Sequence, residues 1–65
     1  MSNATAEFLR STTDTIQRAL KELDEGDAVT ARKYLTIAAN GCTELAARLD
    51  AIEAKYEKRK EENAN

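Results

Sequence analysis

The side chains that most often carry out chemistry in proteins are sparse in this sequence. It has no histidine and one cysteine, Cys42, so it lacks both the usual acid–base group near neutral pH and a thiolate–imidazole pair. Zinc sites need closely spaced cysteine and histidine ligands, and phosphate-binding loops need clustered glycines. The two glycines, Gly26 and Gly41, stand far apart. These absences predict a protein that is not an enzyme and that holds no metal or other cofactor.

The carboxylates that lie closest together are Asp24, Glu25 and Asp27, and they surround Gly26. We expect them to cap helices and to keep a turn soluble. The alternative is a weak, hydrated cation site without the ordered ligand spacing of a calcium loop. An enzymatic site would have to be assembled between chains from groups such as Glu44 and Tyr34.

The same four residues are the strongest turn signal in the chain. Gly26 can end one helix with a positive φ, and Asp27 can cap the next. We therefore predict an all-α fold, an antiparallel helical hairpin with a short helix over about 5–24 and a long helix over about 27–60. We expect residues 1–4 to be a disordered N-terminus or the remnant of an expression tag, and 61–65 to be a disordered tail.

Apolar or small residues recur along the long helix at alternating spacings of three and four, which is the pattern of a seam that packs on other helices. This predicted seam comprises Ala28, Ala31, Leu35, Ala38, Cys42, Leu45, Leu49, Ile52 and Tyr56. The short helix should reach back only to about Ala46, so that the far end of the seam projects beyond it. We therefore predict a homo-oligomer, a dimer forming a four-helix bundle or an antiparallel coiled coil, with an interface made by Leu45, Leu49, Ile52 and Tyr56.

Gly41 lies inside the long helix, where glycine costs about 1 kcal/mol relative to alanine. We expect a close helix–helix contact to offset that cost at Ala38, Gly41 and Cys42, with Cys42 as a small core residue. A tolerated surface glycine or a slight bend is the alternative. On the short helix, Thr12 and Thr13 are interpreted either as half-buried contact positions or as a local break.

A second, narrower stripe contains Tyr34, Ile37 and Gly41. We interpret Tyr34 as a boundary residue or as a contact for a protein partner, and Ile37, Arg32 and Lys33 as further candidate partner contacts. The basic residues near the C-terminus alternate with glutamates, which favours a solvated charged face over a phosphate-binding stripe.

Charge and hydropathy point to a cytoplasmic protein that does not enter a membrane. The net charge is −2, with ten basic and twelve acidic residues. No apolar run approaches the roughly 20 residues that a membrane span needs. The N-terminus lacks the pattern of a signal peptide, and one unpaired cysteine suits a reducing compartment.

Two families share features with this pattern. The spacing of Gly26, Ala31, Leu35 and Ala38 resembles the second half of a tetratricopeptide repeat, which implies the packing of a helical hairpin. The hairpin layout and the small-residue seam resemble the Rop family of plasmid copy-number regulators, dimers of helical hairpins that bind RNA. We expect a non-enzymatic protein–protein interaction or regulatory module that assembles with itself and binds an unidentified protein partner. The alternative is a Rop-like dimeric RNA- or DNA-binding regulator.

Overall fold

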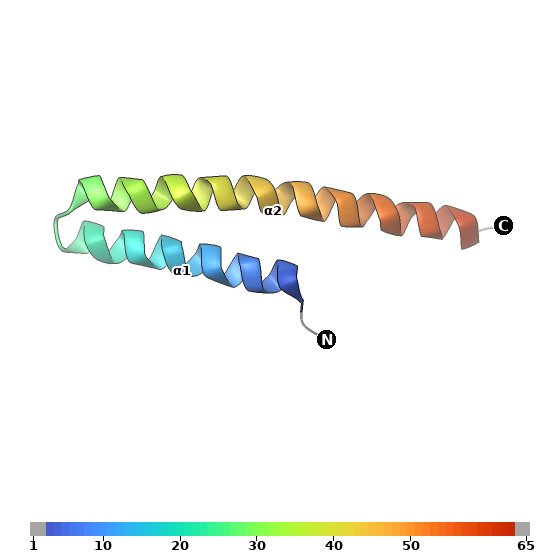
Figure 1. Ribbon diagram of the computed structural model, residues 1–65, viewed down its shortest axis with the longest axis horizontal. Coiled ribbons are helices and arrows are strands. Elements are labelled where there is room, and N and C mark those ends of the chain that lie inside the picture. Colours follow the sequence, from blue (N-terminus) through green and yellow to red (C-terminus); the bar gives the residue numbers. More distant parts are fainter. Residues whose placement is uncertain (1–2, 64–65) are drawn as a thin grey trace.

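The computed structural model describes residues 3–63, with side chains described as far as residue 57. Two helices, α1 (Ala4–Asp24) and α2 (Ala28–Asn63), account for almost all of this part of the chain, which contains no strand. They lie side by side and antiparallel, joined by a tight turn, and form an elongated body of 59 × 22 × 12 Å (Figure 1). The predicted all-α hairpin is confirmed.

The ends of both helices extend further than expected. The backbone N–H of Ala6 donates to the side-chain oxygen of Asn3 over 3.1 Å, so Asn3 caps α1 and Ala4 is already helical. The prediction of disorder over 1–4 is therefore wrong for Asn3 and Ala4, while 1–2 lie outside the described residues. At the other end α2 continues to Asn63, past the predicted end near 60 and into the predicted tail, of which 64–65 lie outside the described residues.

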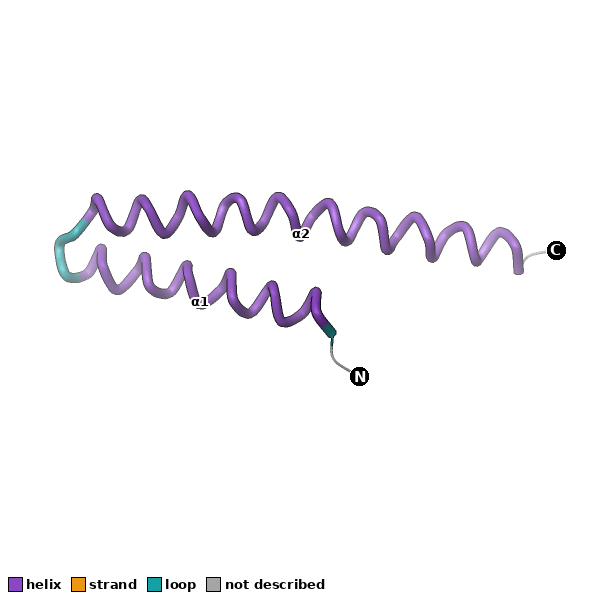
Figure 2. Tube along the Cα trace, viewed as in Figure 1, coloured by secondary structure: helices purple, strands orange, loops and turns teal. Residues whose placement is uncertain are grey.

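The turn between the helices closes as the sequence indicates (Figure 2). Gly26 adopts a φ of +87°, which costs glycine little because it has no Cβ. The N–H groups of Gly26 and Asp27 donate to the carbonyls of Leu23 and Glu22 over 3.0 and 2.8 Å, the paired bonds of a Schellman motif. Asp27 then caps α2 by accepting a hydrogen bond from the N–H of Thr30 over 2.9 Å.

The core between the helices is built from small side chains. Its buried residues are Thr12 and Ala19 of α1 and Ala31, Ala38 and Leu45 of α2. Half-buried residues precede, separate and follow them at spacings of three and four, among them Thr5, Phe8, Thr15 and Glu22 on α1 and Tyr34, Gly41 and Arg48 on α2. The two helices therefore meet along a regular heptad-like stripe on each.

This stripe differs from the predicted seam at every second position. Ala31, Ala38 and Leu45 face α1 as expected, but Leu35 and Leu49 are exposed. The stripe instead includes Gly41, where an added methyl group would stand only 2.8 Å from the hydroxyl of Thr12. Such close approach of the backbones requires small side chains, so α1 lies on the small-residue side of α2 and leaves the leucines uncovered.

Hydroxyl groups do not break α1. Thr12, Thr13 and Thr15 donate their hydroxyl protons to the carbonyls four residues earlier over 3.0, 2.9 and 3.1 Å. These bonds satisfy the hydroxyls within the helix. Thr12 is buried against α2, whereas Thr13 is exposed. The contact interpretation therefore holds for Thr12 alone.

Candidate interaction surface

Large apolar side chains gather on the outside of the hairpin rather than in its core. On α1, Leu9, Ile16 and Leu23 recur every seven residues. On α2 they are members of the predicted seam that are exposed instead of buried. We call this set the apolar stripe; it comprises Leu9, Ile16, Leu20 and Leu23 of α1 and Leu35, Cys42, Leu49 and Tyr56 of α2. Each of these residues is exposed, from 43% for Ile16 to 70% for Tyr56 among the large ones.

The two halves of the apolar stripe lie on the same side of the hairpin. Leu9 of α1 and Leu49 of α2 line one open groove. Residues seven apart return to the same face of a helix, so Ile16 and Leu23 share the face of Leu9. By the same spacing Leu35 and Cys42 share the face of Leu49. The hairpin is therefore a two-helix layer with one side rich in leucine and isoleucine.

The groove lies where the N-terminus of α1 meets α2. Its volume is about 290 Å³, and its lining is mostly apolar. The lining residues are Asn3, Thr5, Ala6, Leu9, Leu45, Leu49 and Ile52. Because Asn3 and Thr5 reach the level of Leu49 and Ile52, α1 extends about one turn further along α2 than the predicted limit at Ala46.

Beyond this groove α2 continues without a partner helix in the chain. It has 36 residues against 21 in α1, a difference of about 22 Å at a rise of 1.5 Å per residue. Figure 1 shows the C-terminal part of α2 projecting past the start of α1. We call residues 53–63 the overhang; its one described large apolar side chain is Tyr56, which is 70% exposed.

The accessible surface of the hairpin is large for its mass. The chain of 7.2 kDa exposes 5600 Å², whereas a compact monomer of that mass exposes about 4,100 Å² by the usual scaling. The excess, about 1,500 Å², is similar to the area that one partner buries in a sizeable, mainly apolar dimer interface.

The predicted interface residues divide between the two sides of α2. Leu49 and Tyr56 belong to the apolar stripe, but Leu45 is only 5% exposed and packs in the hairpin core. Ile52 follows Leu45 by seven residues and so shares the face that meets α1; it is 52% exposed and lines the groove at the start of α1. Leu45 is therefore a contact to α1, contrary to the prediction, because α1 is long enough to cover it.

The predicted close helix contact is divided as well. Ala38 is buried, and Gly41 lies against Thr12 and Phe8 of α1. Cys42 is exposed, so the prediction that it is a core residue is wrong for the hairpin. It lies one position past Gly41, about 100° further around the helix, and so falls on the side of the apolar stripe.

The candidate partner contacts do not form one surface. Tyr34 is half-buried between the buried Ala31 and Ala38, and so faces α1. Ile37 is exposed on the side of α2 away from Leu35, two residues or about 200° around the helix. Arg32 and Lys33 are exposed and, being adjacent, point about 100° apart.

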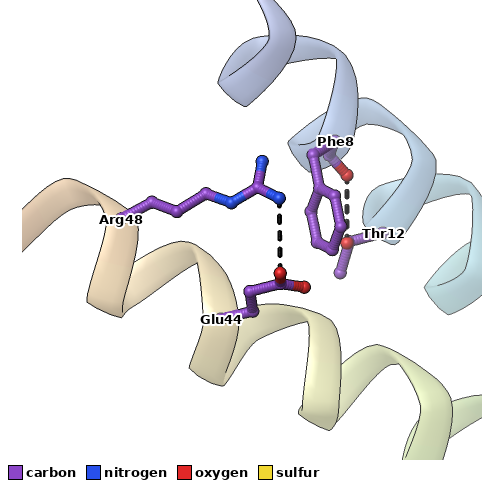
Figure 3. Close-up of polar contacts among 4 residues, drawn as sticks. All are labelled: Phe8, Thr12, Glu44 and Arg48. Carbon is purple, nitrogen blue, oxygen red and sulfur yellow. Dashed lines mark hydrogen bonds and ion pairs between the residues drawn. The ribbon is translucent and has the colours of Figure 1, made fainter.

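A cluster of Phe8, Arg48 and Glu44 ties the two helices together and was not predicted from the sequence (Figure 3). The guanidinium carbon of Arg48 lies 4.7 Å from the centre of the Phe8 ring, within the range of a cation–π contact. The same guanidinium donates to Glu44 over 3.3 Å. The i, i+4 spacing of Glu44 and Arg48 could have indicated their ion pair, but nothing local in the sequence indicates the ring of Phe8.

Of the three carboxylates at the turn, that of Asp27 caps α2. Hydrogen bonds from the backbone N–H and the hydroxyl of Thr30, helped by the charge of Lys33, hold the pKa of Asp27 below its ordinary value. Within the described part of the chain no three metal-binding side chains come together. No helix among the described residues combines the length and apolar character of a membrane span.

The geometry thus defines a helical hairpin with one apolar side and a projecting C-terminal helix. Comparison with protein-family models, with curated proteins and with solved structures gives no match to this chain. Its function therefore has to be inferred from the hairpin itself.

Proposed function

We propose that this protein is a small, non-enzymatic interaction module that works as a homo-oligomeric helical bundle, in its simplest form a dimer. The observation that carries the proposal is the apolar stripe. Large apolar residues recur at heptad spacing on both helices, and most of them lie on the side that the hairpin leaves uncovered. Exposed apolar patches of this extent mark surfaces that bind other proteins.

A second copy of the chain is the partner that fits this surface best. The excess of about 1,500 Å² over a compact monomer is larger than the roughly 800 Å² that each partner buries in a standard interface, so the exposed surface is sufficient for a stable dimer. Two hairpin layers stacked through their apolar sides give a four-helix bundle, in which each helix contacts two neighbours. Each α2 helix already has two adjacent contact stripes, one facing α1 and one formed by Leu35, Cys42 and Leu49.

Sedimentation equilibrium at micromolar concentration tests the proposal. We expect the wild-type chain to be a dimer and the Leu49→Asp variant to be a monomer of lower helical content, since burying an unpaired carboxylate at the interface is unfavourable. Ile37→Asp is the matched control, because Ile37 is exposed to a similar degree on the side away from Leu35. A wild-type chain that is fully folded and monomeric at these concentrations would exclude the proposal.

Binding of nucleic acid by such a dimer is the other function that the hairpin layout suggests. Retardation of RNA hairpins at low salt, lost as salt is raised, would support it, because phosphate contacts release counterions. We expect no retardation, since the side that distinguishes this hairpin is apolar rather than basic.

A further inference from the structure

Asn40 and Gly41 form an asparagine–glycine pair in the interior of α2. Asparagine followed by glycine is especially prone to deamidation, because glycine has no Cβ to hinder attack by its own backbone nitrogen. The side chain of Asn40 is exposed, whereas Gly41 is half-buried against α1. The pair therefore combines a reactive sequence with a position at the contact between the two helices.

We propose that Asn40 is a deamidation site that the folded hairpin protects and that opening of α2 exposes. In the reaction the backbone nitrogen of Gly41 loses its proton and attacks Cγ of Asn40, and the side-chain nitrogen leaves as ammonia. Water then opens the resulting cyclic imide at either carbonyl, which gives aspartate or isoaspartate. Water is the only co-reactant, and the inference does not rest on the proposed self-association.

The helix opposes this reaction in two ways. In an α-helix the N–H of each residue donates to the carbonyl four residues earlier, so the backbone nitrogen of Gly41 is engaged with Ile37. Closure of the imide ring also requires the nitrogen of Gly41 to eclipse Cβ of Asn40, and a helical ψ of about −42° holds these two atoms apart. Attack therefore has to wait until α2 unwinds at this point.

Unwinding at Gly41 also disturbs the contact between the helices. A Cβ at Gly41 would stand 2.8 Å from the hydroxyl oxygen of Thr12 and 3.5 Å from the ring of Phe8, so the backbone there lies directly against α1. Glycine weakens a helix from within, and segments with few buried apolar contacts open most often. The rate of deamidation at Asn40 should therefore report how often the hairpin opens.

Conversion to isoaspartate should prevent the hairpin from closing again. The backbone of isoaspartate runs through Cβ and Cγ, which adds one carbon to the chain directly before Gly41. The helical register is then shifted between Ala38 and Leu45, which both face α1 in the intact hairpin. Prolonged opening of α2 is thereby converted into a permanent loss of the contact.

Mass spectrometry of proteolytic peptides measures the reaction, because replacing an amide by a carboxyl group changes the mass of the peptide. The full chain is incubated at neutral pH, in buffer and in concentrated urea. In urea Asn40 should react much faster than Asn3, which is followed by alanine. In buffer Asn40 should react at least about tenfold more slowly than in urea, which corresponds to about 1.4 kcal/mol in the opening equilibrium.

Two variants test whether opening of the hairpin controls the rate. Leu45→Ala truncates the largest buried side chain of the core, so it should raise the rate in buffer several-fold and leave the rate in urea unchanged. Val29→Ala, at an exposed position of the same helix, should change neither rate appreciably. Equal rates of the wild-type chain in buffer and in urea would overturn the proposal, as would a Leu45→Ala chain that is less stable but reacts no faster in buffer.

The effect on folding has a separate test. Chains with isoaspartate at position 40 are isolated by chromatography and compared with Asn40→Asp, which carries the same charge on a normal backbone. At equal protein concentration the isoaspartate chain should show the lower helical content by circular dichroism. Equal helical content would exclude the permanent loss of the contact, and deamidation in urea that does not favour Asn40 over Asn3 would exclude the site itself.

Discussion

The helices α1 and α2 approach closely at Gly41 and Thr12. The effect of replacing Gly41 by alanine should therefore depend on the residue at position 12. Gly41→Ala normally stabilises a helix by about 1 kcal/mol. Here the added methyl carbon would stand 2.8 Å from the Thr12 hydroxyl oxygen, which is shorter than an ordinary contact. Relieving it requires either separating the helices or rotating Thr12 and breaking its 3.0 Å hydrogen bond to the carbonyl of Phe8.

Overpacking of this kind costs about 1–3 kcal/mol, so Gly41→Ala should destabilise the protein by up to about 2 kcal/mol despite its better helix propensity. For a chain of this size about 4–8 °C in Tm corresponds to 1 kcal/mol. Thermal unfolding followed by circular dichroism, at one fixed protein concentration, measures the effect.

The decisive comparison uses two backgrounds. In Thr12→Ala the obstructing oxygen is gone and the nearest remaining atom, of Phe8, is at an ordinary 3.5 Å. Adding Gly41→Ala there should raise the stability by up to about 1 kcal/mol. In Thr12→Val, which keeps a branched side chain of similar shape, Gly41→Ala should still destabilise. An increase in Tm for Gly41→Ala in the otherwise wild-type chain would refute the close approach.

Two further predictions concern Asp27, the N-terminal cap of α2, and Arg48, which contacts the ring of Phe8. The pKa of Asp27 is lowered in the fold, so its contribution to stability is complete above the ordinary value of 3.8 and is lost as the pH falls through the lowered pKa. Below pH 3.8 the wild-type chain should therefore lose more helical signal than Asp27→Asn, and identical acid profiles would contradict this. Arg48→Ala should lower the free energy of unfolding, measured by chemical denaturation, by about 1 kcal/mol because it removes the contact with Phe8. Glu44→Gln removes only the exposed ion pair and should lower it by less than about 0.5 kcal/mol. Equal losses in the two variants would show that the ring contact contributes nothing.

The features that the sequence determines locally could be predicted from it. Gly26 and Asp27 encode the turn through their own backbone preferences, and the lack of proline leaves long uninterrupted helices on either side. Only the outer helix ends extend further than predicted. Asn3 caps α1 two residues before the predicted start, because a side-chain oxygen at that position satisfies an N–H that would otherwise need water.

The face of α2 that meets α1 could not be predicted in the same way. Apolar or small residues at alternating spacings of three and four form two adjacent stripes on α2. Which of the two stripes packs on α1 depends on the side chains of α1. The face that meets α1 combines Ala31, Ala38 and Leu45 of the predicted seam with Tyr34 and Gly41 of the narrower stripe. The small residues there permit an approach that Leu35 and Leu49 would prevent. The information that selects this face lies on α1, where the buried residues Thr12 and Ala19 are also small and lie seven residues apart.

This division of sizes suggests how folding and association are related. The buried core of the hairpin consists of three alanines, one threonine and one leucine, and alanine contributes little apolar area on burial. Full burial of a leucine or isoleucine is worth about 1.5–3 kcal/mol, and most of those residues lie in the apolar stripe instead. A 65-residue chain with so small a core is marginal by itself. The small residues therefore fix the geometry of the hairpin, while the large ones hold most of the apolar area that only a partner can bury, so that stability should increase with protein concentration as mass action requires.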